Sequence, residues 1–71
     1  MVFNHSKLLG RIIEKFGSQA AFANHIGWAE SRLSNKINNK VRFTDDEIYF
    51  LCLPENLDIH ETDIPVYFFS V

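Results

Sequence analysis

The sequence has a single cysteine, Cys52, among its 71 residues. An internal disulfide and a cysteine metal cluster are therefore excluded, and the chain needs no oxidising compartment, so we expect it in the cytoplasm. No apolar run approaches the roughly 20 residues of a membrane span, and the N-terminus lacks the basic start and long apolar stretch of a signal peptide. We therefore expect no contact with a membrane.

Basic residues are absent beyond position 42. Residues 1–42 carry all seven Lys and Arg against two acidic residues, which gives this part a net charge of +5. Residues 43–71 carry seven acidic residues and no Lys or Arg, which gives −7. Such asymmetry points to nucleic acid or to an oppositely charged protein as the partner, the alternative being solvated helix faces that bind nothing.

The chain also has little that could serve catalysis. It has three glycines but no Gly-rich phosphate loop, and its three histidines lack the spacing of metal ligands. Cys52 falls on the apolar face of a predicted helix, where we expect a buried structural thiol, because reactive thiols need an exposed electropositive setting. We therefore expect neither an enzyme nor a metal or cofactor site.

Apolar residues recur at helical spacing, and no segment alternates with a period of two. The sequence thus predicts a single all-α domain over the whole chain, a compact bundle of four to five short helices. The first helix is predicted over residues 6–16, with Ser6 as its N-cap and Gly17 at its end. The second follows the cap Ser18 and stops at Gly27.

The clearest local signal is FTDDEI, where Thr44 and Glu47 form a capping box. The fourth helix starts there and ends before Pro54, with one side directed inward. A short helical turn is predicted near residues 60–64, followed by an apolar tail.

Three adjacent aromatic residues stand in that tail, at Tyr67, Phe68 and Phe69. They could pack over the small core. Three neighbours cannot all point inward from one short helix, however, so at least one should be exposed. Exposed aromatic side chains are candidate sites of association with a partner.

Residues 16–40, FGSQAAFANHIGWAESRLSNKINNK, have the order helix, glycine turn, helix, which is the helix-turn-helix pattern. Gly27 supplies the positive φ of the turn, and Trp28 is expected as a buried residue at the corner. Leu33 and Ile37 anchor the second helix, from residue 29 or 30 to residue 37. Its other faces are expected to point outward with Ser31, Arg32, Ser34, Asn35, Lys36 and Asn38.

Those outward side chains suit the major groove of DNA. Asn can pair with adenine, Ser can contact several bases, and Arg or Lys can reach guanine or phosphate. Ser18 and Gln19 begin the preceding helix, whose free backbone N–H groups can bind a phosphate, and Lys40 and Arg42 are placed for the DNA backbone.

The segment QAAFANHIGWAESRLSNKINNK resembles the helix-turn-helix of lambda-type phage repressors and Cro proteins. The segments SKLLGRIIEKFGSQAAFA, LSNKINNKVRFTDDEIY and IPVYFF are similar to segments of small Cro-like proteins of temperate phages of Gram-positive bacteria. This resemblance covers nearly the full length, and within the group the chain is most similar to antirepressors that work with the phage repressor.

The resemblance implies a lambda repressor-like fold and a set of contact residues. Gln19 matches a glutamine that contacts the DNA backbone. Lys36 occupies a place that is usually apolar, and the negative Glu30 could accept from cytosine or repel phosphate. The positions that match the family's base-reading residues are Ala29, Glu30, Ser31, Ser34, Asn35 and Asn38.

Two functions follow from this resemblance and from the charge division. The first is antirepression in a phage lysis–lysogeny switch, by a complex with the N-terminal DNA-binding domain of the phage repressor, with or without contact to double-stranded operator DNA. The second is a stand-alone Cro-like repressor that binds the operator itself. Either could act as a homodimer or heterodimer in the cytoplasm of the host bacterium.

Overall fold

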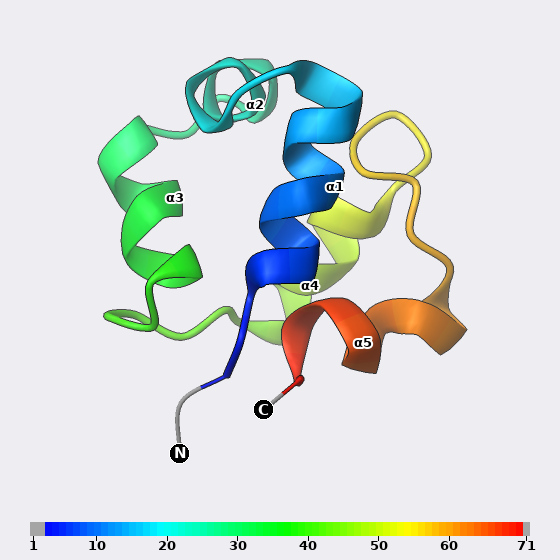
Figure 1. The fold of residues 1–71 in the computed structure, drawn as a ribbon. Coiled ribbons are helices and arrows are strands. Elements are labelled where there is room, and N and C mark those ends of the chain that lie inside the picture. Colours follow the sequence, from blue (N-terminus) through cyan, green and yellow to red (C-terminus); the bar gives the residue numbers. More distant parts are fainter. Residues whose placement is uncertain (1–2, 71) are drawn as a thin grey trace.

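The computed structural model describes residues 3–70, which form a helical bundle (Figure 1). Its elements are α1 (Ser6–Phe16), α2 (Gln19–Ile26), α3 (Glu30–Ile37), α4 (Asp45–Cys52), the 3-10 turn η1 (Glu61–Asp63) and α5 (Ile64–Phe68). The described range contains no strand, so the all-α prediction is confirmed. Within the same range, no helix is both long enough and apolar enough to cross a bilayer.

Several helix ends lie where local signals predicted them. Ser18 Oγ accepts from the Ala21 N–H at 3.1 Å and so caps α2. The capping box of Thr44 and Glu47 is formed at the start of α4. Gly17 and Gly27 end their helices with φ values of 86° and 76°, a region that favours glycine.

The predicted N-cap of the first helix was wrong. Ser6 is the first helical residue, and its N–H donates to Asn4 Oδ1 at 2.9 Å. His5 stands at the cap position without a capping bond, because its ring is used elsewhere. The imidazole is buried, with Nδ1 at 2.9 Å from the carbonyl oxygen of Ile37 and Nε2 at 3.2 Å from that of Phe68. One histidine thus joins the N-terminus, the end of α3 and α5.

A single core receives side chains from every α-helix and from the loop after α4. Ile13, although spaced with the apolar residues of α1, is 49% exposed. Cys52 is buried as expected, and burial raises the pKa of its thiol to about 11. The buried apolar residues are Leu8, Ile12, Phe22, Ala23, Leu33, Ile37, Ile48, Leu51, Cys52, Leu57, Ile59 and Phe68.

The C-terminal tail folds further than the sequence indicated. The turn expected near residues 60–64 is present as η1, but residues 64–68 continue as α5, with Pro65 in its first turn. α5 packs on α1 and α4, and Phe68 is 1% exposed. The Phe68 ring meets Phe43 edge-on at 5.1 Å, so this tail closes one end of the core.

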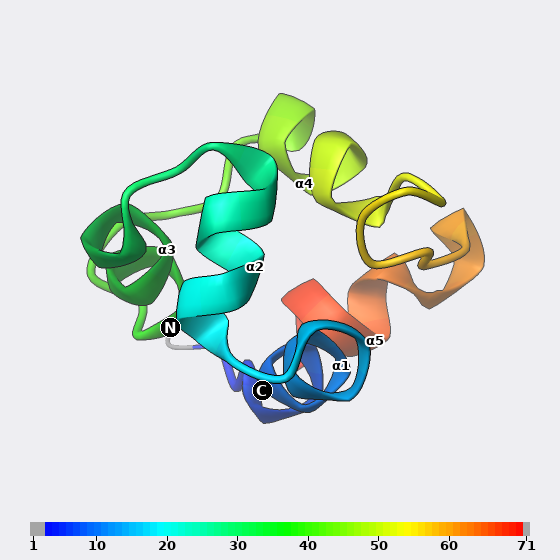
Figure 2. The same ribbon diagram turned by 90° about the horizontal axis from the view of Figure 1, so that it is seen from above.

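The chain bends sharply between α2 and α3, whose axes run in clearly different directions in Figures 1 and 2. Gly27 is in the left-handed conformation, and the Trp28 N–H donates back to the Ala23 carbonyl at 2.9 Å. Trp28 lies at the corner as predicted but is only half-buried. A continuous rod through position 27 is therefore excluded.

The glycines of this chain give a matched test of backbone strain. Gly10 lies within α1 and Gly27 at the bend, and at both positions an added Cβ would meet no atom within 4 Å. We expect Gly10→Ala to stabilise the protein by up to about 1 kcal/mol, because alanine favours helix. Gly27→Ala should destabilise it by about 1 kcal/mol, because its φ is positive.

Thermal and urea unfolding of both variants measures these changes. Shifts of the same sign for the two variants would contradict the assignment of the bend to the left-handed conformation of Gly27.

Candidate nucleic-acid and partner-binding surfaces

The predicted base-reading residues lie along α3 and just beyond it. Those exposed to solvent are Ala29, Glu30, Ser31 and Asn38, whereas Ser34 and Asn35 are half-buried. None is enclosed in the core, in agreement with the expectation that this side faces water. Three of these residues already have polar partners. Asn38 Nδ2 donates to Ser34 Oγ at 3.2 Å, and the backbone carbonyl of Asn35 accepts from the Lys40 N–H at 2.8 Å.

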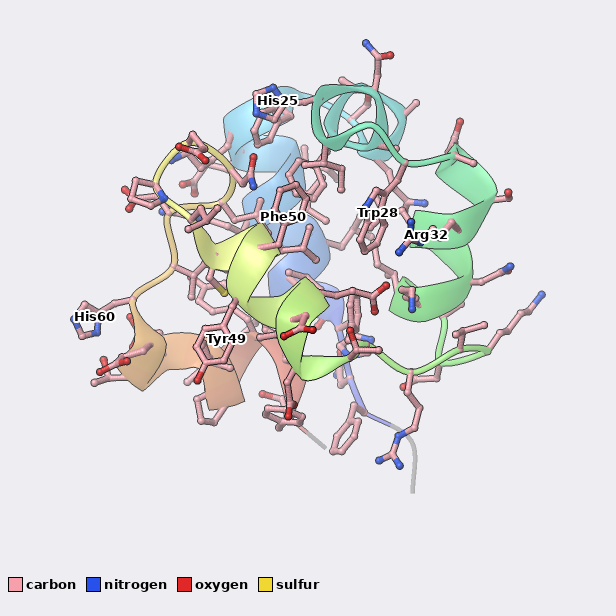
Figure 3. The ribbon with its side chains drawn as sticks, turned by 180° about the vertical axis from the view of Figure 1, so that it is seen from behind. His25, Trp28, Arg32, Tyr49, Phe50 and His60 are labelled. Carbon is pink, nitrogen blue, oxygen red and sulfur yellow. The ribbon has the colours of Figure 1, made fainter. Side chains whose placement is uncertain are left out.

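Arg32 is exposed but is directed along the protein surface. Its guanidinium lies 4.0 Å from the centre of the Trp28 ring, and Nη2 donates to Glu47 Oε2 at 2.8 Å. Figure 3 shows Arg32 beside Trp28, on the side that faces α4. Stacking on tryptophan and a charge-assisted hydrogen bond both favour this position over an extended one.

Lys36 does not point outward, and the expectation that it would was wrong. The residue is 6% exposed, and its Nζ donates to the Arg42 carbonyl at 3.0 Å and to Glu47 Oε1 at 2.8 Å. The physical reason is its place one step before Ile37 on the inner side of α3, where a long side chain can cross to α4. A buried ammonium is tolerated only with such partners.

Glu47 connects three parts of the chain through one carboxylate. It accepts from the Thr44 backbone N–H at 2.8 Å and from both Lys36 and Arg32 at 2.8 Å. Burial by itself raises the pKa of Glu47, but hydrogen bonds from Lys36, the Thr44 backbone and Arg32 outweigh it and lower the pKa to about 2. The carboxylate is therefore charged at neutral pH.

Four of the seven cations of residues 1–42 form ion pairs within the molecule. Arg11 pairs with Glu14, and Lys15 lies 4.0 Å from Asp58, in addition to the two pairs on Glu47. Within residues 3–70 the cations without an ion pair are Lys7, Lys40 and Arg42. α3 itself therefore carries no unpaired cation, and Lys40 and Arg42 flank it in the next loop, both exposed.

The start of α2 was predicted to offer N–H groups to a phosphate. Ser18 is exposed there and Gln19 is half-buried. Ser18 Oγ already takes the Ala21 N–H, so the cap uses one of the free donors of the first turn.

The three C-terminal aromatic residues differ in how far their side chains are buried. Phe68 belongs to the core, Tyr67 is half-buried, and Phe69 is 45% exposed. The prediction that at least one would be exposed is confirmed, and Phe68 is removed from any surface. Phe69 lies beside an open groove of about 600 Å³, which Phe3 and Val41 also line. The sequence carried no signal for this groove, because its walls come from distant segments.

Sequence reasoning also missed a row of exposed apolar residues on α4. Tyr49 and Phe50 stand on the outer side of α4 in Figure 3 and are 63% and 38% exposed. Among residues 3–70 no three His, Cys, Asp or Glu side chains gather as metal ligands would.

Three surfaces are available for recognition: the polar side of α3, the groove beside Phe69 and the outer side of α4.

The family model for proteins of unknown function designated DUF739 matches residues 1–71. The chain belongs to the DUF739 family. Among solved structures, this DUF739 protein is similar to the solution structure of the modulator of repression (MOR) of the temperate bacteriophage TP901-1 from Lactococcus lactis. The identity is 43%, the TM-score is 0.83, and the match covers 97% of this chain and 90% of the other. No curated protein matches the sequence.

The charge on Glu47 should be visible in the pH dependence of stability. Its folded-state pKa of about 2 lies below the ordinary value of 4.5, so its contribution is present above pH 4.5 and is lost as pH falls toward 2. Glu47→Gln keeps a capping side chain but removes the charge. We expect it to lower the free energy of unfolding by about 2 kcal/mol at pH 7, and by progressively less below pH 4.5.

Urea unfolding between pH 2 and 7 measures this difference. The matched control is Glu14→Gln, which removes an exposed carboxylate from the surface pair with Arg11 and should cost under about 0.5 kcal/mol. If the difference in free energy of unfolding between the unaltered protein and Glu47→Gln does not depend on pH, the ion pairing of Glu47 with Lys36 and Arg32 is refuted.

Proposed function

We propose that this DUF739 protein is an antirepressor of a phage lysis–lysogeny switch, which binds the DNA-binding domain of the phage repressor and weakens its hold on the operator. The observation that carries this proposal is the 43% identity, over 97% of the chain, with a protein described as a modulator of repression. The role is one of binding without catalysis, in the cytoplasm of the host bacterium.

The distribution of charge supports a basic protein as the partner. Residues 43–71 carry seven acidic residues and no Lys or Arg, so that part of the chain presents negative charge. A repressor domain that reads DNA presents positive charge. Complementary potentials speed such encounters and select the partner. The exposed Phe69 and the half-buried Tyr67 add aromatic surface for the same contact.

Operator binding by this protein itself is the second candidate, as a Cro-like helix-turn-helix regulator. The bend at Gly27 and the exposed Ser31 favour it, with Lys40 and Arg42 beside α3 as phosphate contacts. Two protomers, or one protomer and a repressor, would then contact half-sites about 34 Å apart. The internal pairing of Arg32 and Lys36 argues for a weak contact of this kind.

A gel shift and a pull-down with all combinations of this protein, the repressor encoded in the same phage genome and operator DNA test the proposal. We expect a complex of the two proteins and a loss of the repressor–operator band as this protein is added. Retention of an unchanged repressor–operator band, with no complex of the two proteins, would refute antirepression.

DNA binding by the protein alone should depend only weakly on salt. Two phosphate contacts, from Lys40 and Arg42, give a slope of about −2 in a plot of log affinity against log salt. Fluorescence anisotropy with operator DNA between about 50 and 200 mM salt measures this slope. A slope of about −6 or steeper, together with preference for operator over random DNA, would favour the stand-alone repressor instead.

A further inference from the structure

The outer side of α4 is apolar even though its inner side already belongs to the core. Tyr49 is 63% exposed, Phe50 38% and Leu53, the residue after the helix, 39%. Residues 48–53 are all apolar, and a helical segment that is apolar all round is normally covered on every side. The described part of this chain covers one side only. We call the outer side, with Asp45 and Asp46 at its start, the α4 ridge.

The α4 ridge continues onto α5. Tyr49 and Phe50 both project from the side of α4 that is turned to the viewer in Figure 3. A hollow of about 200 Å³ lies between α4 and α5, and Tyr49, Asp45, Ile64 and Phe69 line it. Contiguous exposed apolar surface marks interaction sites, and tyrosine in such a surface is a frequent anchor of binding energy.

The charge of the α4 ridge is negative and uncompensated. Asp45 and Asp46 are exposed and form no ion pair within residues 3–70, whereas Glu47 beside them is committed to α3. No Lys or Arg follows Arg42 in the sequence, and Arg42, which lines the groove beside Asp45, forms no ion pair with either aspartate. DNA is therefore repelled from this side, and a basic protein surface is attracted.

A second copy of this chain fits the α4 ridge poorly. In a two-fold symmetric dimer the same patch meets itself, so the Asp45 and Asp46 carboxylates of one copy would find no cation on the α4 ridge of the other. Like charges across an interface are unfavourable. The occupant that fits both the aromatic residues and the carboxylates is a basic surface with apolar side chains between its cations.

We propose that the α4 ridge is the docking site for the DNA-binding domain of the phage repressor. This assignment rests on the proposed antirepressor function and adds where the repressor binds. Asp45 and Asp46 pair with cations that would otherwise contact operator phosphates, and Tyr49 and Phe50 pack against the apolar residues between them. Binding of the α4 ridge thereby covers the repressor surface that reads DNA.

Calorimetric titration of the repressor from the same phage genome into variants of the full chain tests the assignment. Tyr49→Ala should weaken the complex about tenfold or more without unfolding the protein, because Tyr49 is exposed and alanine favours helix. Asp46→Asn should weaken it about two- to fivefold and reduce its dependence on salt. The matched control is Ile13→Ala, which removes a 49% exposed side chain from α1, across the bundle from α4 (Figure 2), and should change the affinity less than twofold.

Circular dichroism of each variant verifies that it is folded. An intact complex with unchanged affinity for folded Tyr49→Ala and Asp46→Asn would overturn the assignment and leave the antirepressor function standing. The absence of any complex with the unaltered protein would overturn both. Light scattering adds a further outcome: a dimer that Tyr49→Ala dissociates would identify the α4 ridge as a self-association surface and overturn the assignment.

Discussion

The carboxylate of Glu47 is the polar contact that joins α3 to the start of α4. It caps α4 through the Thr44 backbone and also neutralises Lys36, which is almost fully buried. A buried ammonium without a partner would cost several kcal/mol, a large share of the stability of a domain of this size. Lys36 can therefore join α3 to the start of α4 because an anion is already fixed there by the capping geometry. Arg32 reaches the same carboxylate from outside.

This contact determines how the basic N-terminal part of the chain appears to a partner. Counted along the sequence, residues 1–42 carry +5, a value that suggests a DNA-binding surface. In the folded protein Arg32 and Lys36 are used to join α3 to α4, and Arg11 and Lys15 pair elsewhere. The acidic residues at 45 and 46 are left without such partners within the described chain. The surface around α3 is therefore less basic than the sequence suggests.

The two sides of α4 differ in environment. Its inner side completes a core that reaches from α1 to α5, and its outer side presents Tyr49 and Phe50 to solvent. α5 makes this division possible, because Phe68 closes the core and leaves Phe69 outside, next to the surface of α4. One side of the short helix α4 is therefore buried in the core, and the other side remains exposed to solvent.

The sequence by itself determined the features that depend on neighbouring residues. The caps at Ser18 and Thr44 and the bend at Gly27 follow from local hydrogen bonds and from the allowed φ, which involve only a few adjacent positions. Helical periodicity likewise gave the four longer helices. Only the tertiary structure decided that Lys36 points inward, that His5 joins α3 to α5, and that the outer side of α4 stays uncovered. Each of these depends on which distant segment lies opposite the side chain, and local pattern carries no information about that pairing.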